Sequence, residues 1–102
     1  MDGGQIKLHF LEGFRQYVEN IADAGRGAIS RDIEAMKKNT TEAISTKQLR
    51  GPVRELIVGN HRVTYFKIRS DIYFVRGFRK KSQKTPKSQI AYAQMMYRFF
   101  KD

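Results

Sequence analysis

The sequence contains no cysteine and no tryptophan, and its two prolines are far apart. Without cysteine the chain can form no disulfide, bind no zinc through thiolates and use no thiol nucleophile. The two histidines, His9 and His61, are distant in sequence and have no cluster of carboxylates near them. Because a metal ion in a protein needs several such ligands, we expect neither a metal site nor a cofactor.

Long hydrophobic runs are missing as well. No apolar stretch approaches the roughly 20 residues that span a bilayer, and the N-terminus lacks the pattern of a signal peptide. We therefore expect a cytoplasmic protein that does not enter a membrane. The 102 residues suffice for one domain, residues 1–102, with a modest hydrophobic core.

Acidic residues are scarce in the second half of the chain. Residues 1–46 hold six Lys or Arg against seven Asp or Glu, which gives a net charge of −1. Residues 47–102 hold fourteen against three, which gives +11. A charge this uneven makes nucleic acid, or another anionic surface, the first partner to consider.

The first half has the pattern of one strand and two helices. Residues 1–4 are expected to be a frayed terminus, and apolar residues alternate with polar ones over 5–10, which predicts a half-buried strand. Apolar residues then recur at helical spacing over 10–21, which predicts an amphipathic helix. The glycines of 24–27 are expected to end it, and a second helix should follow and end at 39–41, completing a helical hairpin. Its inward face is predicted to hold Ile29, Ile33 and Met36.

The second half has the pattern of strands. Residues 42–50 are weakly patterned and are interpreted as a connector. Three strands are expected at 53–58, 62–68 and 72–78, because two-residue turns separate β-branched and aromatic runs. Pro86 then opens a last helix. The order predicts an α+β domain in which the helical hairpin and a C-terminal helix pack on an antiparallel sheet of about four strands.

One stretch, residues 76–87, concentrates positive charge and is called the basic corner here. It starts at the end of an apolar strand, contains no acid, and ends in Thr85-Pro86, where Thr85 can cap the following helix. The cations should therefore lie in a loop between two packed elements. Like charges at this density repel one another, so a polyanionic partner would stabilise them, whereas the simpler alternative is a solvated loop.

Four segments carry a resemblance to a known family. They are residues 49–51, 55–56, 59–66 and 77–86. Together they resemble the HigB branch of the RelE/ParE toxin superfamily, including its phage-derived members. The Gly-Phe-x-Lys-Lys-x-x-Lys-Thr-Pro string of the last segment is the most specific part, and the N-terminal third matches in pattern only.

This resemblance implies the toxin of a type II toxin–antitoxin system. It implies a RelE-like fold and a cognate antitoxin as partner, often one with a helix-turn-helix domain. For the RelE and HigB branches it implies ribosome-dependent cleavage of mRNA, with the 70S ribosome and mRNA as partners. The ParE branch instead poisons DNA gyrase, so a non-nuclease toxin of this fold, or a basic RNA-binding module, is the alternative.

RNA cleavage of this kind needs no metal ion. The 2′-hydroxyl loses a proton and attacks the adjacent phosphorus, and fixed Arg and Lys donors stabilise the charge that develops on the phosphorane. Arg62 matches the strand arginine of the family's Tyr-Arg-Val-x-Tyr pattern, which implies transition-state stabilisation; an arginine that merely covers the sheet is the alternative. Arg79 matches the basic position just past the last strand, which implies phosphate binding.

The acid and base are less clearly marked. Glu55 is the only carboxylate in the basic region, so it is either the general base or a partner that holds a neighbouring arginine. His61 is a further catalytic candidate, although strand alternation points it away from Arg62. Arg54 reaches the same pocket only if its face agrees, and alternation places it opposite Glu55. The candidates for RNA or ribosome binding are Arg54, Arg76, Lys80, Lys81, Lys84 and Lys87.

Overall fold

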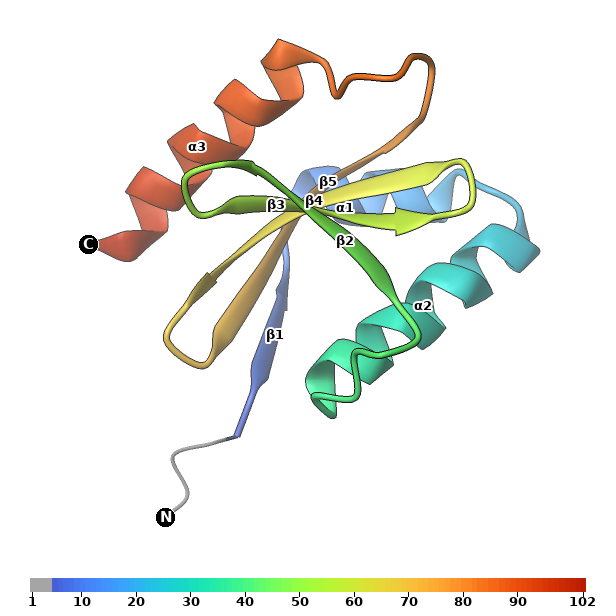
Figure 1. The fold of residues 1–102 in the computed structure, drawn as a ribbon, viewed down its shortest axis with the longest axis horizontal. Helices are drawn as coiled ribbons and strands as arrows, with labels where there is room; N and C mark the ends of the chain where they lie inside the picture. The colour runs from blue at the N-terminus through green and yellow to red at the C-terminus, as the bar shows by residue number, and fades with distance from the viewer. Residues whose placement is uncertain (1–4) are drawn as a thin grey trace.

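The structure, a computed structural model, describes residues 5–102. Residues 1–4, where the sequence predicts a frayed terminus, lie outside the described residues. The elements follow in chain order in Figure 1: β1 (Lys7–Phe10), α1 (Glu12–Glu19), α2 (Asp23–Lys37), β2 (Ser45–Arg50), β3 (Val53–Val58), β4 (His61–Ile68), β5 (Asp71–Arg79) and α3 (Lys87–Lys101).

The strands form a single sheet in the order β1-β5-β4-β3-β2. β1 runs parallel to β5, and all other neighbours are antiparallel. The predicted α+β class is confirmed, but the sheet has five strands rather than about four. The prediction of a connector over 42–50 was wrong, because this segment contains the edge strand β2. Most of its side chains are polar and exposed, so it lacks the apolar alternation by which a strand is recognised.

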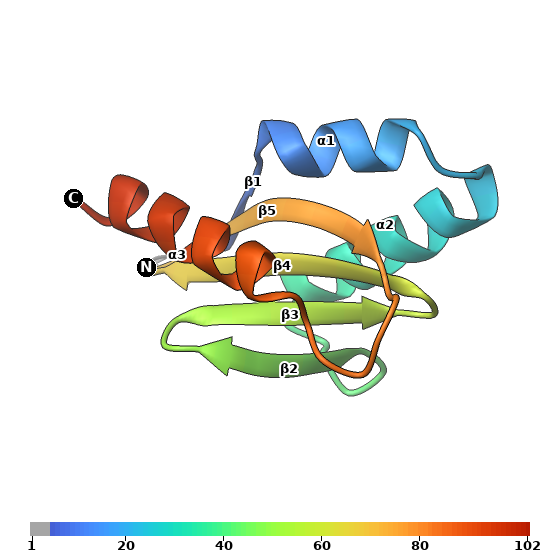
Figure 2. The same ribbon diagram turned by 90° about the horizontal axis from the view of Figure 1, so that it is seen from above.

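Two apolar layers lie on opposite faces of the sheet. α1 and α2 cover one face, where Phe14, Ile29, Ile33 and Met36 are buried. The last three were predicted to face inward, and this is confirmed. α3 covers the other face through Ala93 and its apolar neighbours. Figure 2 shows α3 in front of the sheet and α2 behind it. No helix in residues 5–102 has the length and apolar character needed to cross a bilayer.

The predicted helix break at 24–27 was wrong. The interruption falls between Glu19 and Asp23, and Gly25 lies inside α2. A Cβ atom at Gly25 would stand 2.6 Å from Nε2 of His61, so this glycine allows a helix to approach a side chain of β4. The predicted start of the first helix at Phe10 was also early, because Phe10 belongs to β1.

A β-bulge in β5 changes which side chains face which helix. Tyr65 of β4 pairs with Phe74, whereas Thr64 pairs with Arg76, which leaves Val75 as the extra residue. Beyond the bulge, Arg76 contacts α3, and Gly77 meets α1. Without the bulge, alternation along β5 would have placed Arg76 on the same face as Phe74, which is the face that α1 and α2 cover.

Candidate functional site

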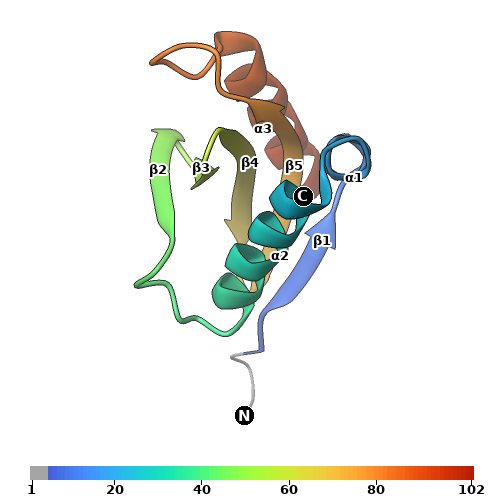
Figure 3. The same cartoon turned by 90° about the vertical axis from the view of Figure 1, so that its right-hand side faces the viewer.

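The basic corner contains a loop that is fixed at both ends. The loop, residues 80–86, joins β5 to α3 and crosses the ends of β4 and β3 in Figure 2 before it returns to the helix. Figure 3 shows it above the strand ends. The backbone N–H of Lys80 donates to the carbonyl oxygen of Asn60 at 2.7 Å, and the Thr85 hydroxyl donates to Glu55 Oε1 at 2.5 Å. The lysines of this loop are exposed.

The sequence predicted that Thr85 could cap α3, and this prediction was wrong. Pro86 is the residue before the first turn of α3, and no side chain there hydrogen-bonds to the helix N-terminus. The Thr85 hydroxyl instead reaches Glu55 of β3, thirty positions earlier. The loop is therefore held against the sheet by a buried carboxylate, and α3 is left to begin without a side-chain cap.

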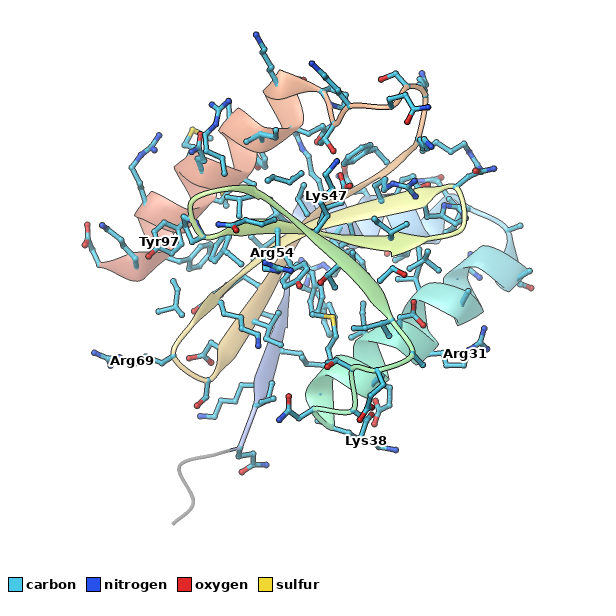
Figure 4. All side chains as sticks on the ribbon, in the orientation of Figure 1. Arg31, Lys38, Lys47, Arg54, Arg69 and Tyr97 are labelled. Carbon is cyan, nitrogen blue, oxygen red and sulfur yellow. The ribbon has the colours of Figure 1, made fainter. Side chains whose placement is uncertain are left out.

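Glu55 lies almost entirely out of water, with 3% of its surface exposed. Its second carboxylate oxygen stands 3.8 Å from Nε of Arg62. The sequence leaves two roles open for Glu55, a general base or a partner that holds a neighbouring arginine. This geometry favours the second role. Lys47 of β2 pairs with Glu55 across the strands and adds an exposed cation to the same face, labelled in Figure 4.

Arg62 is largely occupied by the protein itself. Its Nη1 donates to the carbonyl oxygens of Gly59, at 2.7 Å, and His61, at 3.0 Å, and its side chain is 12% exposed. The hollow between Arg62, Glu55 and the 80–86 loop has a volume of about 20 Å³. A space of this size holds about one water molecule, so the loop closes Arg62 off from an RNA phosphate.

His61 faces away from Arg62, as strand alternation predicts. Its Nδ1 is hydrogen-bonded to the hydroxyl of Tyr17 from α1 at 2.6 Å. Burial lowers the pKa of His61, and the positive charge of Arg79 lowers it further. Burial also raises the pKa of the Tyr17 hydroxyl, with Arg79 acting in the opposite direction. Both groups are therefore neutral at pH 7.

The predicted cations Arg54 and Arg76 have partners elsewhere. Arg54, labelled in Figure 4, lies on the α2 face of β3. Its Nη2 donates to the Thr46 hydroxyl at 3.0 Å. It is thus on the opposite face from Glu55, as alternation predicts, and outside the pocket of Arg62. The guanidinium of Arg76 lies over the ring of Tyr92 on α3 at 3.7 Å, a stabilising cation–π geometry.

Sequence reasoning missed an open groove beside β5, which we call the β5-edge groove. It has a volume of about 550 Å³ and is lined by Tyr17, Gly77, Phe78, Arg79, Lys81, Pro86, Ser88 and Gln89. Tyr17 falls within residues 10–21, whose apolar spacing predicts an amphipathic helix and no functional role. The signal that could have marked it is Gly77, because a glycine inside a strand indicates a close approach by another group.

The shifted pKa of His61 predicts how stability depends on pH. Because the folded protein holds this histidine neutral below the ordinary pKa of 6.5, the unfolded chain binds a proton that the folded chain does not. The free energy of unfolding should therefore fall as the pH drops through and below 6.5. Urea unfolding at pH 7.5 and 5.5 should show a larger loss for wild type than for His61→Gln. Equal losses in the two proteins would contradict the assignment.

Three solved structures share this fold over most of the chain. The RelE–RelB complex from Pyrococcus horikoshii OT3 aligns with a TM-score of 0.62 at 14% identity, covering 78% of this chain and 99% of that chain. The RelB–RelE antitoxin–toxin complex from Methanococcus jannaschii gives 0.61 at 18% identity, covering 90% and 98%. The isolated E. coli RelE toxin gives 0.60 at 15% identity, covering 93% and 99%. The chain therefore has the RelE-like toxin fold.

A match to a family model assigns the chain to one family among the proteins with the RelE-like fold. The family model described as "Phage derived protein Gp49-like (DUF891)" matches residues 16–98, and the chain belongs to that family. The predicted resemblance to the phage-derived, HigB-like members of the RelE/ParE superfamily is confirmed. A search of curated proteins found no match.

Proposed function

We propose that this protein is the toxin of a type II toxin–antitoxin system and that it cleaves mRNA on the ribosome without a metal ion. The observation that carries the proposal is the cationic surface at the end of the sheet. Residues 76–87 hold six Lys or Arg and no Asp or Glu, and the loop that presents Lys80, Lys81 and Lys84 is anchored to β3 and to the turn between β3 and β4. A cationic surface of this charge density is suited to a polyanionic backbone.

The proposed roles follow from exposure. Arg79, with Lys80, Lys81, Lys84 and Lys87, contacts the phosphates of mRNA or ribosomal RNA, since all five side chains are exposed. Glu55 positions Arg62 and holds the loop through Thr85 rather than acting as the general base. Arg62 stabilises the phosphorane when RNA binding lifts the 80–86 loop, because the closed hollow has no room for a phosphate.

The proposed partners are a cognate antitoxin, the ribosome and mRNA. The RelE-like structures from Pyrococcus horikoshii and Methanococcus jannaschii are complexes with RelB, which supports an antitoxin for this chain. The proposed site of action is the cytoplasm.

A non-nuclease toxin of the same fold is the second candidate. One observation favours it: Arg62 and Glu55, where the sequence predicts catalysis, are closed off, and His61 lies on the other face. A gyrase poison would cause double-strand DNA breaks and an SOS response while the message stays intact. These readouts separate it from an mRNA nuclease.

Primer extension on a reporter mRNA in a purified translation system tests the leading proposal. New 5′ ends should appear only when ribosomes are present. Lys80→Gln/Lys84→Gln should reduce their yield by about tenfold, since each lost phosphate contact weakens RNA binding. The matched control, Lys37→Gln/Lys38→Gln, removes the same charge at the end of α2, far from the loop in Figure 4, and should cleave like wild type.

Two results would contradict the proposal. Intact mRNA together with growth arrest and an SOS response would favour the gyrase poison. Intact mRNA together with normal growth would favour a basic RNA-binding module.

A further inference from the structure

We propose that the β5-edge groove binds one unpaired RNA nucleotide, with the phosphate on Arg79 and Lys81 and the base stacked on Tyr17. The inference rests on the proposed function in that the ligand is the same RNA strand. It adds a binding site built partly from α1, which the sequence did not assign to the functional surface.

The groove exists because β5 extends beyond the end of its parallel neighbour β1. β1 pairs with β5 only over Asp71–Phe74, and the backbone N–H of Leu11 closes that ladder on the Phe74 oxygen. After the bulge at Val75, residues 76–79 pair with β4 alone among the described strands. The opposite side of this segment faces α1 and the first turn of α3, which form the two walls of the groove.

The ring of Tyr17 is held in place from two directions. Its hydroxyl is bonded to His61 Nδ1 at 2.6 Å, and its ring lies directly over Gly77, where a Cβ would approach Cδ2 to 2.3 Å. Gly25 in turn leaves the space that His61 occupies. Two glycines thus admit two rings that fix each other. A ring that is already ordered loses little conformational entropy when a base stacks on it.

The charge of the groove suits a phosphate. Arg79 and Lys81 are exposed at its rim, and no Asp or Glu lines it. Arg79 pairs with His61 across β4 and β5, and Arg79 and Tyr17 line the same groove. A planar guanidinium can bind two phosphate oxygens at once.

Gln89 supplies a polar group on the α3 wall. Its Oε1 is buried and, among the residues that the structure describes, has no hydrogen-bond partner. Buried polar atoms are rarely left unsatisfied, so such an atom beside a groove indicates a missing partner. Gln89 lines the groove together with Tyr17, and a side-chain amide can hydrogen-bond to the edge of a base.

The size and position of the groove favour a nucleotide. Its volume of about 550 Å³ contrasts with about 20 Å³ over Arg62, so of the two hollows beside the 80–86 loop the groove is the one with room for a base. The two hollows share Phe78, Lys81 and Pro86, so a strand that enters the groove continues over the 80–86 loop. A base must be unpaired to enter, which favours single-stranded RNA over a duplex.

The test measures binding of a fluorescent 2′-O-methyl tetranucleotide, which lacks the attacking hydroxyl and cannot be cut, to the isolated protein by anisotropy. Tyr17→Leu should weaken binding by about tenfold, the size of one lost stacking contact. Tyr17→Phe keeps the ring and should stay within about threefold of wild type. Arg79→Gln should lower the salt slope of log affinity by roughly 0.7, the value of one phosphate contact to a single strand.

Two matched controls remove the same groups elsewhere. Arg69→Gln changes the tight turn between β4 and β5, and Phe99→Leu changes an aromatic ring that is 72% exposed on α3. Both should bind like wild type. Amide chemical shifts of the wild-type protein should change at Gly77, Arg79 and Gln89 when the tetranucleotide is added.

The outcomes separate this inference from the proposed function. Unchanged affinity in both Tyr17→Leu and Arg79→Gln, or shifts confined to other surfaces, would overturn the groove even if mRNA cleavage is observed. Groove shifts and a loss of affinity in both variants would support it even if primer extension finds no cleaved message.

Discussion

Replacing Arg62 with alanine should lower the free energy of unfolding by about 3 kcal/mol and reduce mRNA cleavage by about a hundredfold. The loss of stability arises because Arg62 and Glu55 form a pair that is 12% and 3% exposed. Without the guanidinium, the Glu55 carboxylate remains buried and, within residues 5–102, keeps the Thr85 hydroxyl as its hydrogen-bond partner. The loss of activity follows from removing a fixed cationic donor near the developing charge.

A double variant separates these two effects. Arg62→Ala/Glu55→Gln removes the buried charge together with its partner and keeps an oxygen that can accept from Thr85. Its stability should therefore return most of the way to wild type, because a buried pair replaced as a whole costs little. Cleavage should stay low if Arg62 acts on the RNA.

Urea unfolding and primer extension on the same four proteins make this measurement: wild type, the two single variants and the double variant. Recovery of cleavage together with stability in the double variant would show that Arg62 only supports the fold. In that case the alternative from the sequence, an arginine that covers the sheet, would be correct.

Replacing Phe66 with alanine should cost about 3–5 kcal/mol of unfolding free energy. Phe66 of β4 is fully buried on the α3 face, and its ring lies 5.2 Å from the ring of Tyr73 and 5.3 Å from that of Tyr97. The cavity would remove contacts that hold α3 on the sheet. Since domains of this size are stable by about 5–15 kcal/mol, much of the total would be lost.

Circular dichroism during urea unfolding measures this effect, and Phe99→Ala is the matched control. Phe99 lies on the same helix but is 72% exposed, so its loss should change stability by less than about 0.5 kcal/mol. Hydrogen exchange should show α3 opening more readily in Phe66→Ala. A cost similar to that of the control would mean that α3 is held mainly by other contacts.

Local pattern in the sequence accounts for much of the fold. β3, β4 and β5 were predicted because β-branched and aromatic residues alternate between tight turns. The same period of two placed Arg54 opposite Glu55 and His61 opposite Arg62, and the structure confirms both. β2 was missed because an edge strand buries little, so its polar side chains carry no alternation.

The exposed loop of the basic corner, residues 80–86, was determined by the sequence itself, since a run of lysines between an apolar strand and a proline is typical of a solvated loop. Arg76 and Arg79 belong instead to β5, and Lys87 to α3. What lies around the loop was decided by the tertiary structure. Thr85 meets Glu55, and Tyr17 meets His61, across gaps of 30 and 44 positions. The bulge at Val75 then reverses the faces that follow it. Periodicity reports which way a side chain points from its own strand; which distant side chain it meets, and whether Arg62 is open or covered, depends on how the elements pack.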